Sequence, residues 1–257
     1  MTASITVLGG FFWLHYAKDR RKHVANLYWF FGVTSLQAIQ PTAQAMFRKQ
    51  KAIKSVSDFG VLAWLRKAEL EGLTIEVDAF DRAKLRRSIP KFRSLTLQDP
   101  EDFYPEMQRL CAECGVALVL VPALPKTYIC GATLWRKDKA ILALSVRGKW
   151  ADIFWFTFFH ELAHLINHSK KESRISYEDD ASAEEKAANA VASHFLIPDG
   201  EYQAFLSNEN YTDRQKIRVF AEKVGIAPCI VVGRLLHDKL IDFGAYRSMR
   251  PSFEFFG

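Results

Sequence analysis

The residues best suited to chemistry lie in one short run, His160-Glu161-Leu162-Ala163-His164. Residues four apart in a helix share a face about 6 Å apart, so the two imidazoles can bind one metal ion. Glu161 is rotated about 100° from His160, where its carboxylate can take a proton from a water molecule instead of binding the ion. Zinc favours imidazole and carboxylate ligands and an open position for water. The run therefore predicts a zinc site with His160 and His164 as ligands and Glu161 as catalytic base.

The residues before this run support a metal site over a chance occurrence of the motif. They are rich in aromatic side chains, which would bury the helix: Phe154, Trp155, Phe156, Phe158 and Phe159. Buried polar groups are costly unless something compensates them, and a metal ion would do so. The alternative is a pair of histidines that are packed and hydrogen-bonded in the core, which these flanking residues make less favourable.

A third protein ligand must come from outside the motif. His168 lies about 12 Å along the helix axis from His160, too far to share its ion. In metzincins a third histidine would stand at position 170, and that residue is Lys170. Neither position therefore completes the site.

Two acids further along the chain are better candidates. Ser182 has the character of a helix N-cap, and Pro198 would end that helix. Glu184 and Glu185 fall in its first turn and flank its apolar face almost equally. Periodicity leaves both open as the third ligand, and either could equally be a solvated acid that the helix dipole favours.

The pattern of apolar residues predicts an α+β fold that is mainly helical, with a small sheet of about three strands. Helices are expected from Ser57 to Gly72, from Pro100 to about Cys114, and over most of residues 149–240. Three apolar runs between them are typical of strands: Val116–Val121, Ile129–Trp135 and Ala140–Val146. We expect a basic helical docking region in residues 1–98 and the catalytic domain in residues 99–257.

Charge is unevenly distributed along the 257 residues, whose net charge is +6. Residues 1–100 hold 16 Lys or Arg against 8 Asp or Glu, and the remainder is nearly balanced. The apolar run Ile5–Ala17 is too short to span a membrane, and its basic residues follow it, unlike those of a signal peptide. We therefore expect a buried helix or an interface helix there and a cytoplasmic protein. Cys111 and Cys114 lack a second cysteine pair and are expected to be structural thiols.

Two segments together resemble one peptidase family. The sequence H-E-L-A-H-L-I-N-H, followed by E-E-K-A-A-N-A-V-A-S-H-F-L-I-P, is similar to the ImmA/IrrE metallopeptidases. The resemblance extends over roughly Asn26 to Ile241 and implies a zincin-like core. It aligns Glu185, four residues before Asn189, with the third metal ligand. Longer members carry an N-terminal helix-turn-helix domain of the XRE type, which this sequence does not show.

The resemblance also implies an activity. Members of the family cleave helix-turn-helix repressors in stress-response or mobile-element regulation, and others occur in toxin–antitoxin-like pairs. We accordingly expect a Zn²⁺ endopeptidase, with Mn²⁺ as a second possible ion, that cleaves an XRE-type repressor or an antitoxin. Direct DNA binding is not expected. The alternative function is a non-catalytic regulator that binds a partner or DNA through its basic N-terminal half.

Substrate contacts are harder to assign from sequence. A peptidase needs a hydrogen-bond donor for the oxyanion that forms in the reaction. Tyr177, His168 and His194 are candidates because they lie near the motif in sequence. We also expect Ala140–Val146 to form a sheet edge that pairs with an extended substrate.

Overall fold

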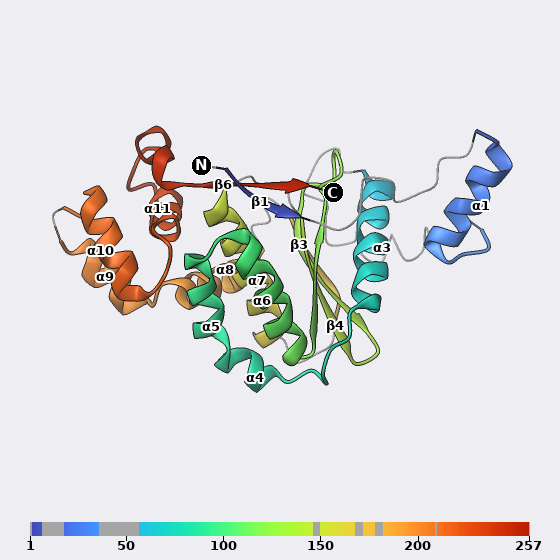
Figure 1. Ribbon diagram of the computed structural model, residues 1–257, viewed down its shortest axis with the longest axis horizontal. Helices are drawn as coiled ribbons and strands as arrows, with labels where there is room; N and C mark the ends of the chain where they lie inside the picture. Colours follow the sequence, from blue (N-terminus) through green and yellow to red (C-terminus); the bar gives the residue numbers. More distant parts are fainter. Residues whose placement is uncertain are drawn as a thin grey trace.

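A computed structural model describes residues 2–6, 18–35, 57–145, 150–167, 172–177, 182–208 and 210–256. Within these residues, a four-stranded sheet carries helices on both faces, and a two-stranded sheet joins the two ends of the chain (Figure 1). None of the described helices is both long enough and apolar enough to cross a bilayer. The predicted α+β class with mainly helical content is confirmed.

The elements begin and end at defined residues. In chain order they are β1 (Thr2–Thr6), α1 (Arg20–Phe31), α3 (Asp58–Thr74), α4 (Arg82–Arg87), α5 (Ile89–Ser94), η2 (Leu95–Leu97), α6 (Pro100–Glu113), β2 (Val116–Val121), β3 (Ile129–Arg136), β4 (Lys139–Ser145), α7 (Ala151–Asn167), β5 (Arg174–Tyr177), α8 (Ala183–Leu196), α9 (Asp199–Leu206), α10 (Arg214–Val224), α11 (Pro228–His237), η3 (Phe243–Met249) and β6 (Ser252–Phe256).

The four-stranded sheet has the order β2-β4-β3-β5. β2 runs parallel to β4, whereas β3 is antiparallel to both β4 and β5. The three predicted strands are present, and β5 is a fourth that the apolar pattern did not predict. The expectation that Ala140–Val146 forms a sheet edge is wrong, because β4 lies between β2 and β3. The outer strands of this sheet are β2 and β5.

Both faces of the sheet are buried, which explains why the sequences of β2, β3 and β4 are nearly continuous apolar runs. Alternate residues of β2 point to opposite sides: Ala117, Val119 and Val121 pack with α3, and the others join the larger core around α6 and α7. α3 lies on one side of the sheet and α6 and α7 on the other (Figure 1). The metal-binding motif is therefore carried by a helix whose position the sheet fixes.

Capping residues set the helix starts as predicted. The Ser57 hydroxyl accepts a hydrogen bond from the Gly60 amide at 3.2 Å and begins α3. Asp99 is the N-cap of α6, with Pro100 in its first turn. Cys111 and Cys114, at the end of α6, are buried free thiols, as expected of a structural pair.

The two ends of the chain meet in a small sheet. β1 pairs in parallel with β6, and Ala151 at the start of α7 donates a backbone hydrogen bond to Pro251. The helix expected from Ile5 is therefore wrong at its start, which belongs to β1. Residues 7–17 lie outside the described residues.

A buried ion pair links this C-terminal segment to α7. Arg250 donates to both carboxylate oxygens of Asp152 at 2.9–3.2 Å, and both side chains are almost fully buried. The guanidinium also lies over the rings of Trp150 and Phe243. Because a buried charge is costly without its partner, this pair holds the start of α7 against the C-terminal segment.

The predicted division at residue 98 stays a prediction. Leu85 and Phe92, from α4 and α5, are fully buried in the core that α6 and α7 share. Arg86, Arg87 and Lys91, on the same two helices, are exposed. This stretch of chain therefore contributes to the core and presents positive charge to solvent.

A candidate metal centre between two helices

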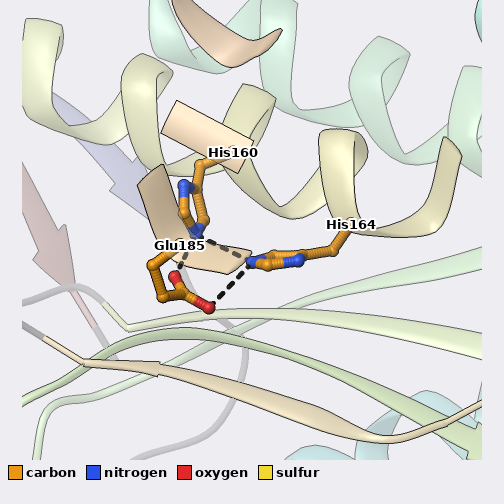
Figure 2. Close-up of side chains that lie close together, drawn as sticks. All are labelled: His160, His164 and Glu185. Carbon is orange, nitrogen blue, oxygen red and sulfur yellow. Dashed lines mark hydrogen bonds and ion pairs between the residues drawn. The ribbon is translucent and has the colours of Figure 1, made fainter. Parts of the chain in front are cut away.

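Three side chains from α7 and α8 converge on one point (Figure 2). Nε2 of His160 lies 3.0 Å from Nε2 of His164 and 2.8 Å from Oε2 of Glu185. Nε2 of His164 lies 3.2 Å from the other Glu185 oxygen. All three residues are buried. Three potential ligand atoms thus face one another inside the protein.

These distances fit a metal ion. Zn–N and Zn–O bonds are about 2.0–2.2 Å long, so two ligands of one tetrahedral ion lie roughly 3.3 Å apart. The three separations between the ligand atoms are close to that value. A set of two imidazoles and one carboxylate is also the ligand set of many catalytic zinc sites, which leave one position open. The residues present therefore fit the ion that the sequence predicts.

The structure distinguishes Glu185 from Glu184. The carboxylate of Glu184 is about half exposed and forms an ion pair with Arg174 at 2.6 Å. Glu185 turns instead toward His160 and His164. Ser182 caps the helix by accepting a hydrogen bond from the Glu185 amide at 3.3 Å, which fixes where this first turn begins. Of the two acids, only Glu185 is in a position to share an ion with the histidines.

Asn189 fixes the orientation of His160. Its Oδ1 lies 2.8 Å from Nδ1 of His160, one helical turn after Glu185. An imidazole that donates its Nδ1 proton to this oxygen keeps the lone pair of Nε2 for a metal. The sequence motif contains Asn189, but sequence reasoning gave it no role.

The Glu161 carboxylate occupies an unusual environment. The residue is fully buried, and neither of its oxygens has a hydrogen-bond partner among the described residues. Burial raises its pKa, while the charges of His160 and His164 act in the opposite direction. A buried carboxylate without a hydrogen-bond partner is costly, which is typical of a group kept for chemistry.

Charge within the cluster favours a metal-binding state of Glu185. Burial alone would raise the pKa of Glu185, but its hydrogen bonds with His160 and His164 lower it to about 2. Burial opposes protonation of His160, yet the hydrogen bond to Glu185 raises the pKa of this imidazole. The carboxylate is therefore ionised at neutral pH and ready to bind a cation.

Gly131 and Ser176 line the sheet side of Glu161. They are directly opposite each other on β3 and β5, so their side-chain positions share one face of the sheet. A β-carbon at Gly131 would meet the Glu161 side chain. Sequence reasoning missed both residues because β5 was not predicted and strand pairing is not visible in a local pattern.

The three candidates for oxyanion stabilisation are placed differently. Tyr177 follows Ser176 on β5 and packs with Ile129 in the core on the α3 side, on the sheet face opposite Glu161. His194 is exposed in the last turn of α8, more than two helical turns beyond Glu185. Its Nδ1 forms a hydrogen bond with the Asp199 carboxylate. The structure brings neither side chain to the cluster. His168 lies outside the described residues.

The site therefore consists of an H-E-x-x-H motif on a helix packed against a small sheet, with a carboxylate from a second helix beside its two histidines. Residues 119–235 match the family model of the IrrE N-terminal-like domain, peptidase family M78. This segment is therefore an ImmA/IrrE-type metallopeptidase domain, and it contains all three members of the cluster and Glu161. No curated protein matches the chain.

Proposed function

We propose that this protein is a zinc-dependent endopeptidase that cleaves a partner protein. The observation that carries the proposal is the buried Glu161 carboxylate, without a hydrogen-bond partner, one residue after the first of three converging ligands. A purely structural metal site uses four protein ligands and needs no such carboxylate beside it. Three protein ligands and an adjacent base are instead the arrangement of a hydrolytic zinc site.

Each residue then has a definite role. His160, His164 and Glu185 would hold the ion, which when bound supplies Lewis-acid polarisation of the peptide carbonyl and of water. Glu161 accepts a proton from the attacking water molecule while the water oxygen forms a bond to the carbonyl carbon. The C–N bond then breaks, and the same carboxyl returns the proton to the leaving amine.

The substrate we propose is a helix-turn-helix repressor of the XRE type, or an antitoxin, in the cytoplasm. The match to the IrrE N-terminal-like domain supports a protein substrate, and the resemblance over the motif segments supports a regulatory one. An extended segment of the substrate can pair with the outer edge of β5, next to Glu161. The basic residues 1–98 form the docking region in this proposal.

Cleavage of a purified repressor tests the proposal. We expect the zinc-loaded protein to cut an XRE-type repressor at one peptide bond, seen as two fragments by mass spectrometry. Glu161→Gln should slow cleavage by about 10²–10⁴-fold while one metal ion per chain is retained. Glu76→Gln, which changes an exposed acid just after the end of α3, is the matched control and should cleave normally.

Failure of the wild-type protein to cleave the repressor would favour a non-catalytic regulator. In that case the wild-type chain would bind its ion and the repressor without cutting it. A salt-sensitive mobility shift on DNA by the full chain would then assign the basic residues to nucleic acid.

A further inference from the structure

Ser176 on β5 is a second buried polar group beside the metal centre. Its side chain is 3% exposed, and its hydroxyl has no hydrogen-bond partner among the described residues. An unsatisfied buried hydroxyl costs stability, as an unsatisfied buried carboxylate does. Ser176 and Glu161 are complementary in this respect, because a hydroxyl can donate a hydrogen bond and an ionised carboxylate can only accept one.

Alternation along β5 points the Ser176 side chain toward α7. Its two neighbours, Ile175 and Tyr177, pack in the core on the α3 side of the sheet. Successive side chains of a strand point to opposite faces, so Ser176 lies on the face that α7 covers. The Glu161 carboxylate lies against the same face, at Gly131.

Strand pairing brings the hydroxyl close to the carboxylate. Ser176 is directly opposite Gly131 in the register of β3 and β5, and β-carbons of opposite residues are about 5 Å apart. A β-carbon at Gly131 would lie 2.5 Å from Oε1 of Glu161, so Ser176 is the next side-chain position along the sheet. Burial raises the pKa of the Glu161 carboxyl, and Ser176 is near enough to act in the opposite direction.

Other polar side chains near the carboxylate are occupied or face elsewhere. His160 bonds to Asn189 through Nδ1 and to Glu185 through Nε2, and Nε2 of His164 also faces Glu185. The Ser176 hydroxyl has no competing partner in the part of the chain that the structure describes. It is therefore the donor best placed to serve Glu161.

We propose that Ser176 is a positioning residue for Glu161, its hydroxyl donating a hydrogen bond to one oxygen of the carboxylate. In free enzymes such hydrogen bonds are often long or poorly aligned, and they tighten in the complex with the substrate. The other carboxylate oxygen stays free to accept the proton of the attacking water. The inference rests on the proposed function and adds the group that holds its general base in place.

The kinetics of Ser176→Ala separate positioning from substrate binding. We expect kcat for repressor cleavage to fall by about 10–100-fold, the effect of losing a hydrogen bond to a charged group, with KM within twofold and one metal ion per chain. Ser176→Thr keeps the hydroxyl and should retain most of the rate. A raised KM with unchanged kcat would place the hydroxyl on the substrate and overturn the proposal.

Ser145→Ala is the matched control. The Ser145 hydroxyl, on β4, is also buried without a hydrogen-bond partner among the described residues. It follows Leu144, which is opposite Gly131 and packs on the α7 side, so Ser145 points to the other face of the sheet. Its removal should leave kcat within twofold of wild type.

A double-mutant cycle of urea unfolding tests the contact without any cleavage. With a chelator present, Ser176→Ala should lower the folding equilibrium constant about five- to tenfold more in the Glu161 background than in Glu161→Gln, because a charged acceptor forms the stronger hydrogen bond. Coupling in a wild-type protein that does not cleave would refute the proposed peptidase and retain the contact. Equal effects in both backgrounds, or an unchanged kcat in Ser176→Ala, would overturn the role of Ser176.

Discussion

The Glu161 carboxylate on α7 lies against the backbone of Gly131 on β3. A β-carbon built on Gly131 would lie only 2.5 Å from Oε1 of Glu161, closer than any two such atoms can approach. Glycine in a strand often marks such a close approach. It lets the sheet come near enough to α7 to bury the carboxylate beside the two histidines.

Gly131→Ala should therefore impair catalysis without removing the metal. The added methyl group must push the Glu161 carboxylate aside, and a displacement of about 1 Å can cost about 10²-fold in rate. We expect a large loss of cleavage rate, with the metal content by mass spectrometry close to one ion per chain. Gly200→Ala, where nothing lies within 4 Å of the new carbon, is the control. A variant with the wild-type rate would show that Glu161 does not need its present position.

Asn189→Leu should weaken metal binding. The substitution removes the oxygen that accepts the Nδ1 proton of His160, and loss of such an outer partner typically costs 10–100-fold in metal affinity. Competition with a chelator measures that affinity directly. Asn189→Asp, which keeps the acceptor, should retain most of it. Equal metal affinities in Asn189→Leu and wild type would show that Asn189 does not support metal binding.

Acid should weaken the attachment of α3 to the sheet. Burial raises the pKa of Glu69, but its hydrogen bonds with Arg136 and Arg66 prevail and lower it below 4.5. A carboxyl with a lowered folded-state pKa stabilises the fold above its unfolded pKa, and this contribution is lost as pH falls below about 4.5.

The pH dependence of unfolding by urea, in wild type and Glu69→Gln, measures this contribution. At pH 7 the variant should be less stable by about 1 kcal/mol, and the difference should shrink toward zero at pH 3. Glu76→Gln, at an exposed acid close to the end of α3, is the control. A difference between Glu69→Gln and wild type that stays constant from pH 7 to pH 3 would contradict the assignment.

Local signals in the sequence predicted much of this architecture. The Ser57 and Ser182 caps and the apolar run Val116–Val121 specify their elements through nearby residues alone, and the structure has them where expected. Non-local relations were not predictable in this way. The interior place of β4 depends on pairing with β2 and β3, and β5 is only four residues long.

The same contrast between local signals and non-local contacts applies to the site. The spacing of His160 and His164 is enough to place two imidazoles on one helix face. The choice between Glu184 and Glu185 depends on Arg174, which lies on β5 and draws Glu184 away from the cluster. Tyr177 was an attractive candidate by its position in the sequence, but alternation along β5 turns it to the other face of the sheet.

The most direct test of the account is the metal content of Glu185→Gln beside that of Glu184→Gln. The two acids are adjacent, so the variants differ mainly in which side chain loses its charge. The account predicts one zinc ion per chain in wild type and in Glu184→Gln, and loss of stoichiometric zinc in Glu185→Gln, measured by mass spectrometry after dialysis. Full zinc occupancy in Glu185→Gln, or its loss in Glu184→Gln alone, would contradict it.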